Sequence, residues 1–440
     1  MTHGQVMEGA LPRSMLVAAI LAAAVSPCCQ RELMPTPNLF AASAADPFGD
    51  VPPELRNNRV DVLYGTDRRP IRESGGGLGY GYQRSKSLAF GICTIRIGRD
   101  LPWEELVRQS RAKTRSLRLP LSVAEIRETG RFPPTPVPVT QDRDRFVEDP
   151  ATVHAQHQNS RRLSELLSEQ LRRTPRHEAL LYIHGYNNEF QDGAFVAAGF
   201  WHFMGRAGVP IIYTWPAGSP FSILRGYAHD RESGEFTIYH LKQFLRAVVS
   251  CPELEKLHVI AHSRGTDVFM TALRELHIEF AAAGRETRSE LKLGNVILAA
   301  ADLDWEVAQE RIAAEHVTLV PERITVYVSQ WDRAIRIADW IFGSTQRLGQ
   351  LRGSDLTPEE CQALESLSQA QVIDVRVISN WTGHDYFHAN PAVSSDIVLL
   401  LRDNRGAGAE NGRPLFKRLD NFWEIRDGYP GGTHPQPAHP

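Results

Sequence analysis

The sequence predicts an α/β fold in which a mostly parallel sheet is doubly wound, with helices on both of its faces. Two observations lead to this prediction. From about residue 160 onward, short apolar runs of strand length alternate with amphipathic segments of helix length. One of the apolar runs, Leu257–Ile260, passes directly into a helical pattern that opens at Gly265. The 440 residues and their 42% hydrophobic content suffice for a large buried core.

The alternation defines the expected elements. Strands are expected at residues 179–183, 209–214, 257–260, 295–300, 323–328 and 372–378. Helices are expected at residues 160–172, 190–205, 305–314, 333–342 and 392–401, with a long, partly helical segment at 221–249. Upstream, two strands at 59–66 and 87–98 flank a glycine-rich connection, 74–82. Because a strand and not a helix follows this connection, it indicates a hairpin loop and not a nucleotide-binding loop.

Composition divides the chain into three parts. Residues 1–54 are a signal-like segment and a Pro- and Ala-rich linker, residues 55–404 are the α/β domain, and residues 405–440 are a tail whose end we expect to be disordered. Within the domain, residues 101–158 are expected to be a surface excursion, 215–235 a candidate lid, and 343–371 a polar surface insertion. An apolar cluster in the tail is a candidate for docking on the domain: Leu415, Phe416, Leu419, Phe422 and Trp423.

The N-terminus has the pattern of a targeting segment. Arg13 precedes an apolar run, Met15–Val25, which is too short to span a bilayer and fits a signal sequence. Cys28 and Cys29 follow, as at the lipidation site of bacterial lipoproteins, although Pro27 replaces the small residue expected there. Another candidate cleavage site follows Ala45. We therefore expect export to the periplasm or cell envelope, with lipid anchoring and membrane association at the N-terminus as a candidate; the alternative is a cytoplasmic protein.

Charge and cysteine content argue against several other classes. The formal net charge is −3 and the basic residues are scattered, so nucleic acid is not an expected partner. The cysteines lack the spacing of metal ligands beyond one adjacent pair, so we expect no zinc site and no disulfide framework. These five cysteines are Cys28, Cys29, Cys93, Cys251 and Cys361. The serine chemistry described below needs no metal or organic cofactor, and none is expected.

Ser263 lies on the predicted turn between the strand at 257 and the following helix. A nucleophilic serine on such a turn requires small residues two positions before and after it, because strand and helix pass close together. Ala261 and Gly265 occupy these positions. The alternative is a buried serine that caps the helix.

A nucleophilic serine needs a histidine base and a carboxylate that orients it, which follow in the order Ser, Asp, His in this type of fold. Asp332 follows the strand at 323–328, and His384 follows the strand at 372–378. Asp302 and Asp304, one strand earlier, are alternatives for the acid, and Asp332 as a helix cap is another interpretation. His388 is the alternative to His384, or either is an ordinary surface histidine.

Backbone donors are also needed for the oxyanion of an acyl-transfer reaction. We expect one from the N–H of Arg264, the residue after the serine, and one from the N–H of Tyr186 in the loop after the strand at 179. The alternative is an ordinary turn in which Gly185 relieves strain. The residues expected to line the substrate site are His184, Trp215, Tyr227 and Trp331.

Seven short sequence blocks give the chain a resemblance to a known protein family. The blocks YGTDR, LLYIHGYNNEF, YTWPAGS, HVIAHSRGT, ILAAADLD, VYVSQWDRAIRI and GHDYF, in this order, are similar to a bacterial α/β-hydrolase family of unknown function with esterase- and lipase-like members. The resemblance covers about residues 59–404 and implies an α/β-hydrolase fold with Ser263, Asp332 and His384 as a triad. Arg264 and Thr266 depart from the Met and Asn that are more frequent in the family.

The sequence therefore predicts a serine hydrolase that cleaves carboxylic esters, or related acyl bonds, of small-molecule substrates. Two alternatives are a catalytically silent hydrolase-fold protein that binds a ligand at the cell envelope, and an acyltransferase that uses the same triad.

Overall fold

The structure is a computed structural model that describes residues 31–42, 46–73, 75–220, 223–332, 347–367, 369–377, 383–426 and 428–431. Its parallel strands are β1 (Arg59–Arg72), β6 (Glu178–Ile183), β7 (Val209–Thr214), β8 (Lys256–His262), β9 (Leu293–Ala299), β10 (Arg323–Val328), β11 (Ala370–Val375) and β13 (Phe422–Ile425). Three antiparallel strands complete the main sheet: β2 (Leu78–Ile97), β3 (Leu121–Arg131) and β12 (Phe416–Leu419).

These strands form one eleven-stranded sheet in the order β12-β13-β11-β10-β9-β8-β6-β7-β1-β2-β3. All neighbours from β13 to β1 run parallel, and only the two ends of the sheet are antiparallel. Strand β8 therefore lies in the middle of the sheet. The predicted mostly parallel α/β architecture is confirmed.

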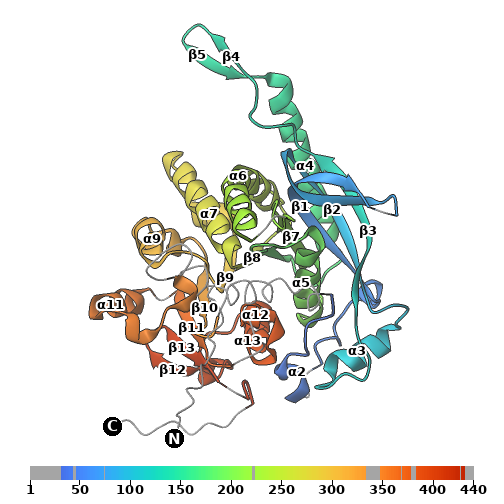
Figure 1. Cartoon of the computed structure of the whole chain (residues 1–440), viewed down its shortest axis with the longest axis vertical. Helices are drawn as coiled ribbons and strands as arrows, with labels where there is room; N and C mark the ends of the chain where they lie inside the picture. Colours follow the sequence, from blue (N-terminus) through green and yellow to red (C-terminus); the bar gives the residue numbers. More distant parts are fainter. Residues whose placement is uncertain are drawn as a thin grey trace, which may run out of the picture.

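Helices cover both faces of the sheet (Figure 1). On one face, α4 (Pro150–Leu171), α6 (Ile223–Val249) and α7 (Arg264–Ala282) share a core with one side of the strands. On the other face, α5 (Phe190–Phe203) and α13 (Pro391–Asp403) pack in a second core. Alternate residues of β8 are buried in the two cores: Val259 and Ala261 in the first, and Ile260 in the second. Burial on both faces explains the uninterrupted apolar runs of the central strands.

Residues 31–54 were expected to be a linker, and this prediction is wrong for the part that the structure describes. Leu33, Met34 and Phe40 are buried in the second core, Phe40 in the short helix α2 (Asn38–Ala42). Arg115 donates a hydrogen bond to the carbonyl of Leu33 at 2.7 Å. The apolar side chains that stand between the prolines pack into the second core, although the proline content indicated a linker. Residues 1–30, with the predicted signal segment and Cys28 and Cys29, lie outside the described residues.

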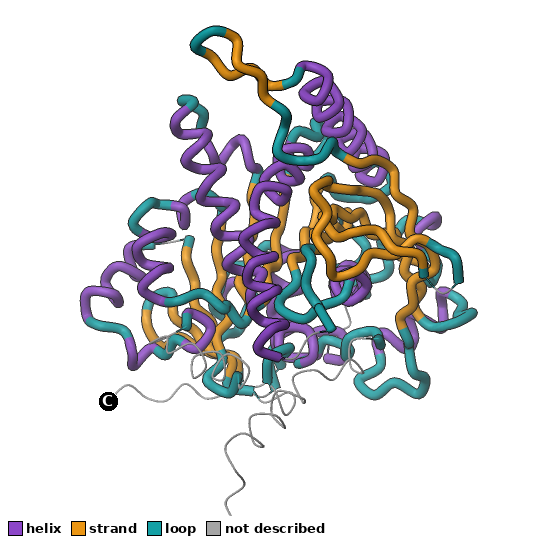
Figure 2. The backbone as a smooth tube through the Cα atoms, turned by 45° about the horizontal axis from the view of Figure 1, so that its top comes forward, coloured by secondary structure: helices purple, strands orange, loops and turns teal. Residues whose placement is uncertain are grey.

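Residues 101–158 were expected to be an irregular segment on the surface, but they contain regular secondary structure. They contain α3 (Trp103–Arg111) and β3, and β3 extends the main sheet as its last strand. Many side chains of β3 are exposed, so it lacks the apolar pattern by which strands are recognised. Next follows a separate hairpin of β4 (Val139–Asp142) and β5 (Arg145–Glu148), which projects away from the body together with the start of α4 (Figures 1 and 2).

Three further boundaries differ from the prediction. Helix α6 begins at Ile223, so much of the candidate lid is the start of a 27-residue helix. In the predicted insertion, Leu348 and Leu351 are buried in the first core, ahead of α11 (Pro358–Ser366). The apolar cluster of the tail docks on the domain as predicted, with Leu415 and Phe422 buried. It forms β12 and β13, and β13 pairs with β11, so the sheet continues past residue 404. The helix predicted at 333–342 lies outside the described residues.

The remaining helices are short: α8 (Thr287–Leu291), α9 (Trp305–Ala308), which continues into a π-helical turn over Gln309–Ala313, and α12 (Tyr386–Ala389). None of the described helices combines the length and the apolar character needed to cross a membrane.

Candidate functional site

The turn between β8 and α7 holds Ser263 in a strained conformation. Its φ of 52° and ψ of −127° are rare for a residue with a side chain. The turn is tightly packed, since a Cβ at Gly265 would lie 2.4 Å from the carbonyl oxygen of His184. The side chain of Ser263 makes no capping hydrogen bond to α7, which argues against the interpretation as a helix cap. The predicted strand, turn and helix are all present, with Ala261 fully buried at the position usually occupied by glycine.

A histidine and a carboxylate meet near this turn. Asp332 follows β10 and His384 follows β11, and His384 Nδ1 lies 2.8 Å from Asp332 Oδ2. Asp332 is fully buried, whereas 23% of the His384 side chain is exposed. Burial lowers the pKa of His384, but the charge and the hydrogen bond of Asp332 outweigh it, so the net shift is upward.

The alternative acids have other partners. Asp302 forms an ion pair with Arg347 at 3.2 Å and accepts a hydrogen bond from the hydroxyl of Tyr227 at 3.4 Å. Asp304 caps α9 by accepting a hydrogen bond from the backbone of Val307. Of the three carboxylates, Asp332 is the one that contacts the imidazole of His384, while Asp302 acts on it only through its charge.

The loop that carries His384 approaches the Asp332 loop closely. Gly383 has a φ of +65°, and a Cβ there would lie 2.8 Å from the carbonyl oxygen of Trp331. Glycine is needed at this position both for its conformation and for the space. His388 lies one turn further on, in α12, and burial lowers its pKa.

His262 connects the serine turn with the histidine loop. Its ring lies 4.8 Å from the ring of His384, and its Nε2 lies 3.2 Å from the carbonyl oxygen of His384. Burial and the neighbouring imidazole of His384 hold the pKa of His262 well below its usual value. Within the described residues, the hydroxyl of Ser263 and the imidazole of His384 do not form a hydrogen bond with each other. Catalytic hydrogen bonds of this kind are often long in the absence of substrate.

The loop after β6 lies against the serine. A Cβ at Gly185 would lie 2.7 Å from the Cβ of Ser263. The loop is fixed by Asp230 of α6, which accepts hydrogen bonds from the amides of Asn187 at 2.9 Å and Gly218 at 3.3 Å. Among the described residues, the amides of Tyr186 and Arg264 have no acceptor.

Arg68 also supports this loop, a role that its sequence context does not predict. Its guanidinium donates to the carbonyls of Asn188 and Ala217, at 2.8 and 2.9 Å. Burial lowers its pKa to about 10, against the opposing charges of Asp230 and Asp67. The only signal for Arg68 in the sequence is its place in the block YGTDR, and Asp230 carried none.

Two of the four residues predicted to line the substrate site do not face an open surface. His184 and Trp215 are 1% and 0% exposed, and their rings stack 5.1 Å apart. The indole N–H of Trp215 donates to the carbonyl of His184, so the pair forms an internal support of the loop. Tyr227 is partly buried 5.6 Å from the ring of Tyr186, and Trp331 is 49% exposed.

Another buried histidine and carboxylate pair lies away from Ser263. His240 of α6 lies 2.9 Å from Asp67 of β1, and the two side chains are 1% and 0% exposed. The other ring nitrogen of His240 lies 3.0 Å from the hydroxyl of Thr135. This pair links α6 to the hairpin of β1 and β2.

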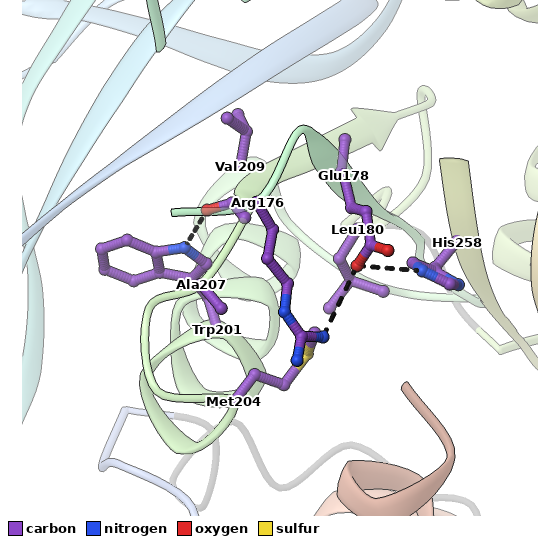
Figure 3. Close-up of a pocket in the computed structure, with 10 residues that line it drawn as sticks. Arg176, Glu178, Leu180, Trp201, Met204, Ala207, Val209 and His258 are labelled. Carbon is purple, nitrogen blue, oxygen red and sulfur yellow. Dashed lines mark hydrogen bonds and ion pairs between the residues drawn. The ribbon is translucent and has the colours of Figure 1, made fainter. Parts of the chain in front are cut away.

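A small pocket opens at the amino ends of the central strands, opposite the carboxyl ends where Ser263 lies (Figure 3). It is lined at the starts of β6 and β7 and near the start of β8, where Glu178 lies 3.7 Å from both Arg176 and His258. Ser263, in contrast, follows the end of β8. In parallel sheets ligands bind at the carboxyl ends of the strands, so we do not assign the candidate site to this pocket.

No cluster of three or more metal-ligating side chains occurs among the residues that the structure describes. Comparison with known proteins finds neither a curated relative nor a solved structure that matches the chain. A family model, described as alpha/beta hydrolase of unknown function (DUF900), matches residues 159–403. This range runs from α4 to the end of α13 and includes Ser263, Asp332 and His384. The chain belongs to this family of α/β hydrolases.

Proposed function

We propose that the protein is a serine hydrolase of the esterase type, with Ser263 as nucleophile, His384 as base and Asp332 as the residue that orients the base. The observation that carries this proposal is the 2.8 Å contact between His384 and buried Asp332, next to a serine on a strained turn. Asp332 accepts the Nδ1–H of His384, which leaves Nε2 unprotonated and able to accept a proton.

The reaction proceeds in two halves. The oxygen of Ser263 attacks the carbonyl carbon of the ester as His384 takes the hydroxyl proton. The tetrahedral intermediate collapses, the ester C–O bond breaks, and His384 returns the proton to the leaving alcohol. Water then attacks the acyl-serine in the same way, which releases the acid and restores Ser263.

The oxyanion is stabilised by the amides of Tyr186 and Arg264. Both amides lack an acceptor among the described residues, and the loop of Tyr186 contacts Ser263 through Gly185. Asp230 and Arg68 hold this loop rigid, so its amides need little reorganisation as negative charge develops.

The charged and polar groups near Ser263 favour a polar substrate over one with a long alkyl chain. The amide of Asp302 donates to the carbonyl of Ser263 at 3.3 Å, and its carboxylate is paired with Arg347 and Tyr227. Arg264, directly after the serine, forms an ion pair with Asp267 at 3.0 Å. A polar substrate can form hydrogen bonds with these groups, whereas a long apolar chain cannot.

The test is covalent labelling with a fluorophosphonate probe, followed by peptide mapping. Wild-type protein should carry the adduct on Ser263, and Ser263→Ala should lose both the adduct and roughly 10⁴- to 10⁶-fold in turnover. Ser250→Ala, at the end of α6, is the matched control and should label like wild type. If folded wild type is not labelled, the proposal fails and a silent binding protein becomes the better interpretation.

We also propose that the N-terminal segment exports the protein and that Cys28 or Cys29 carries a lipid. The chain is attached to the folded body from Arg31 onward, whose carbonyl accepts a hydrogen bond from Leu121 at 2.6 Å. An anchor at these cysteines would hold the body close to the bilayer. Mass spectrometry of the membrane fraction should find a lipid-modified cysteine, and recovery of full-length, unmodified chain in the soluble fraction would contradict the proposal.

A further inference from the structure

The hydroxyl of Tyr386 joins three segments of the chain: the start of α12, strand β10 and the residues that follow β9. Tyr386 is 1% exposed and lies two residues after His384, at the start of α12. Its hydroxyl donates to the carbonyl of Tyr327 on β10 at 2.7 Å and accepts a hydrogen bond from the amide of Ala300, after β9, at 3.0 Å.

Both hydrogen-bond partners of Tyr386 lie a few residues before a residue of the candidate site or one that contacts it. The chain continues from Ala300 to Asp302, whose amide donates to the carbonyl of Ser263 at 3.3 Å. From Tyr327 it continues to Asp332. One hydroxyl therefore ties the segments of the nucleophile, the acid and the base together, at the point where the pairing of β9 and β10 ends.

We propose that Tyr386 is a positioning residue, whose hydroxyl fixes His384 relative to Asp332 and Ser263. This inference rests on the proposed function. Base and nucleophile must be held to within about 0.5 Å of their productive geometry, and such precision needs supporting contacts behind the reacting groups.

The fold itself depends little on this hydroxyl. The amide of Ala300 also lies 3.3 Å from the carbonyl of Tyr327, so it keeps a backbone acceptor when the hydroxyl is removed. The ring of Tyr386 stays in the second core in a Tyr386→Phe variant. Loss of the hydroxyl should therefore change the position of His384 more than the stability of the protein.

The experiment compares wild type with Tyr386→Phe and with Tyr64→Phe. Tyr64 is a matched control, because its buried hydroxyl forms a hydrogen bond with that of Tyr80 at 2.9 Å, away from the three segments that Tyr386 joins. In Tyr386→Phe, the rate of fluorophosphonate labelling and kcat should fall about tenfold with KM within twofold. Tyr64→Phe should keep wild-type values, and both variants should lose a similar, small amount of thermal stability.

An NMR titration of the His384 imidazole provides a readout that does not require activity. The pKa of His384 should fall in Tyr386→Phe, because the contact with Asp332 that raises it loosens, and it should not change in Tyr64→Phe. Equal pKa values in all three proteins would overturn the inference even if the wild type is inactive. Absence of labelling of the wild type, in contrast, would contradict the proposed function alone.

Discussion

Two pairs of histidine and carboxylate in this protein have nearly the same geometry and different surroundings. His384 lies 2.8 Å from Asp332, and His240 lies 2.9 Å from Asp67. The second nitrogen of His240 is occupied by Thr135 and the ring is buried. His384 is 23% exposed, and its second nitrogen has no partner among the described residues. A close pair alone therefore does not mark a site. The proposed role of His384 depends on its partial exposure and on a second ring nitrogen that has no partner among the described residues.

Replacement of each histidine by alanine should give the largest difference between the two pairs, in activity for one and in stability for the other. His384→Ala should lower kcat/KM by about 10⁴-fold or more with little change in stability. His240→Ala should leave activity within a few-fold but lower the free energy of unfolding by about 3 kcal/mol, because it leaves Asp67 buried without its partner. Ester hydrolysis and chemical denaturation measure the two effects. Similar losses of activity in both variants would remove the distinction.

The carboxylates sharpen the comparison further. Asp332→Asn should lower kcat about 10³- to 10⁴-fold, because an amide in place of the acceptor favours the wrong tautomer of His384. Asp302→Asn should cost less than tenfold, since Asp302 is paired with Arg347 and Tyr227. Steady-state kinetics on a short ester would measure both, and the reverse order of effects would reassign the acid to Asp302.

The pH dependence of activity tests the environment of His384. A base acts only when unprotonated, and the pKa of His384 is raised above its usual value of about 6.5. The acid limb of kcat/KM should therefore have its midpoint above this value, with activity lost as the pH falls through it. In Asp332→Asn the residual activity should have its midpoint shifted to lower pH. A wild-type midpoint below 6 would show that Asp332 does not act on His384.

The smallest effect is expected from Trp331, an exposed residue next to the candidate site. Trp331 is 49% exposed directly before Asp332. Trp331→Ala should raise KM by about three- to tenfold with kcat nearly unchanged, as expected for a contact made equally in the ground and transition states. The matched substitution Leu117→Ala, at another exposed apolar residue, should leave KM unchanged. A fall in kcat alone would indicate that Trp331 acts through Asp332.

The sequence predicted the central sheet and the residues of the candidate site because both follow local rules. Strand ends place Ser263, Asp332 and His384 on one edge, and their order along the chain suffices to find them. The family comparison confirms the fold, while the catalytic roles stay a prediction. Asp230 and Arg68 were missed because their function depends on contacts between segments far apart in sequence, with the amide of Asn187 and the carbonyl of Asn188.

The same reason explains the errors. His184 and Trp215 belong to the right loops, but only the packing shows that their rings stack on each other inside the protein. The segment around Leu33 is short and interrupted by prolines, so its burial becomes visible only when α5 is in place. Docking of Phe422 and Trp423 was predicted, but their pairing as strand β13 becomes visible only when β11 is in place.

The projecting hairpin of β4 and β5 suggests a natural place to divide the chain. Phe146 is 77% exposed there, which makes it accessible to a protease. The part before it contributes β1, β2 and β3, and the part after it contributes β7, which pairs with β1. A cut in the hairpin would thus leave two fragments joined by backbone pairing and a shared core. Such fragments should reassemble when mixed, and the proposed ester hydrolysis would then report that β1 has paired with β7.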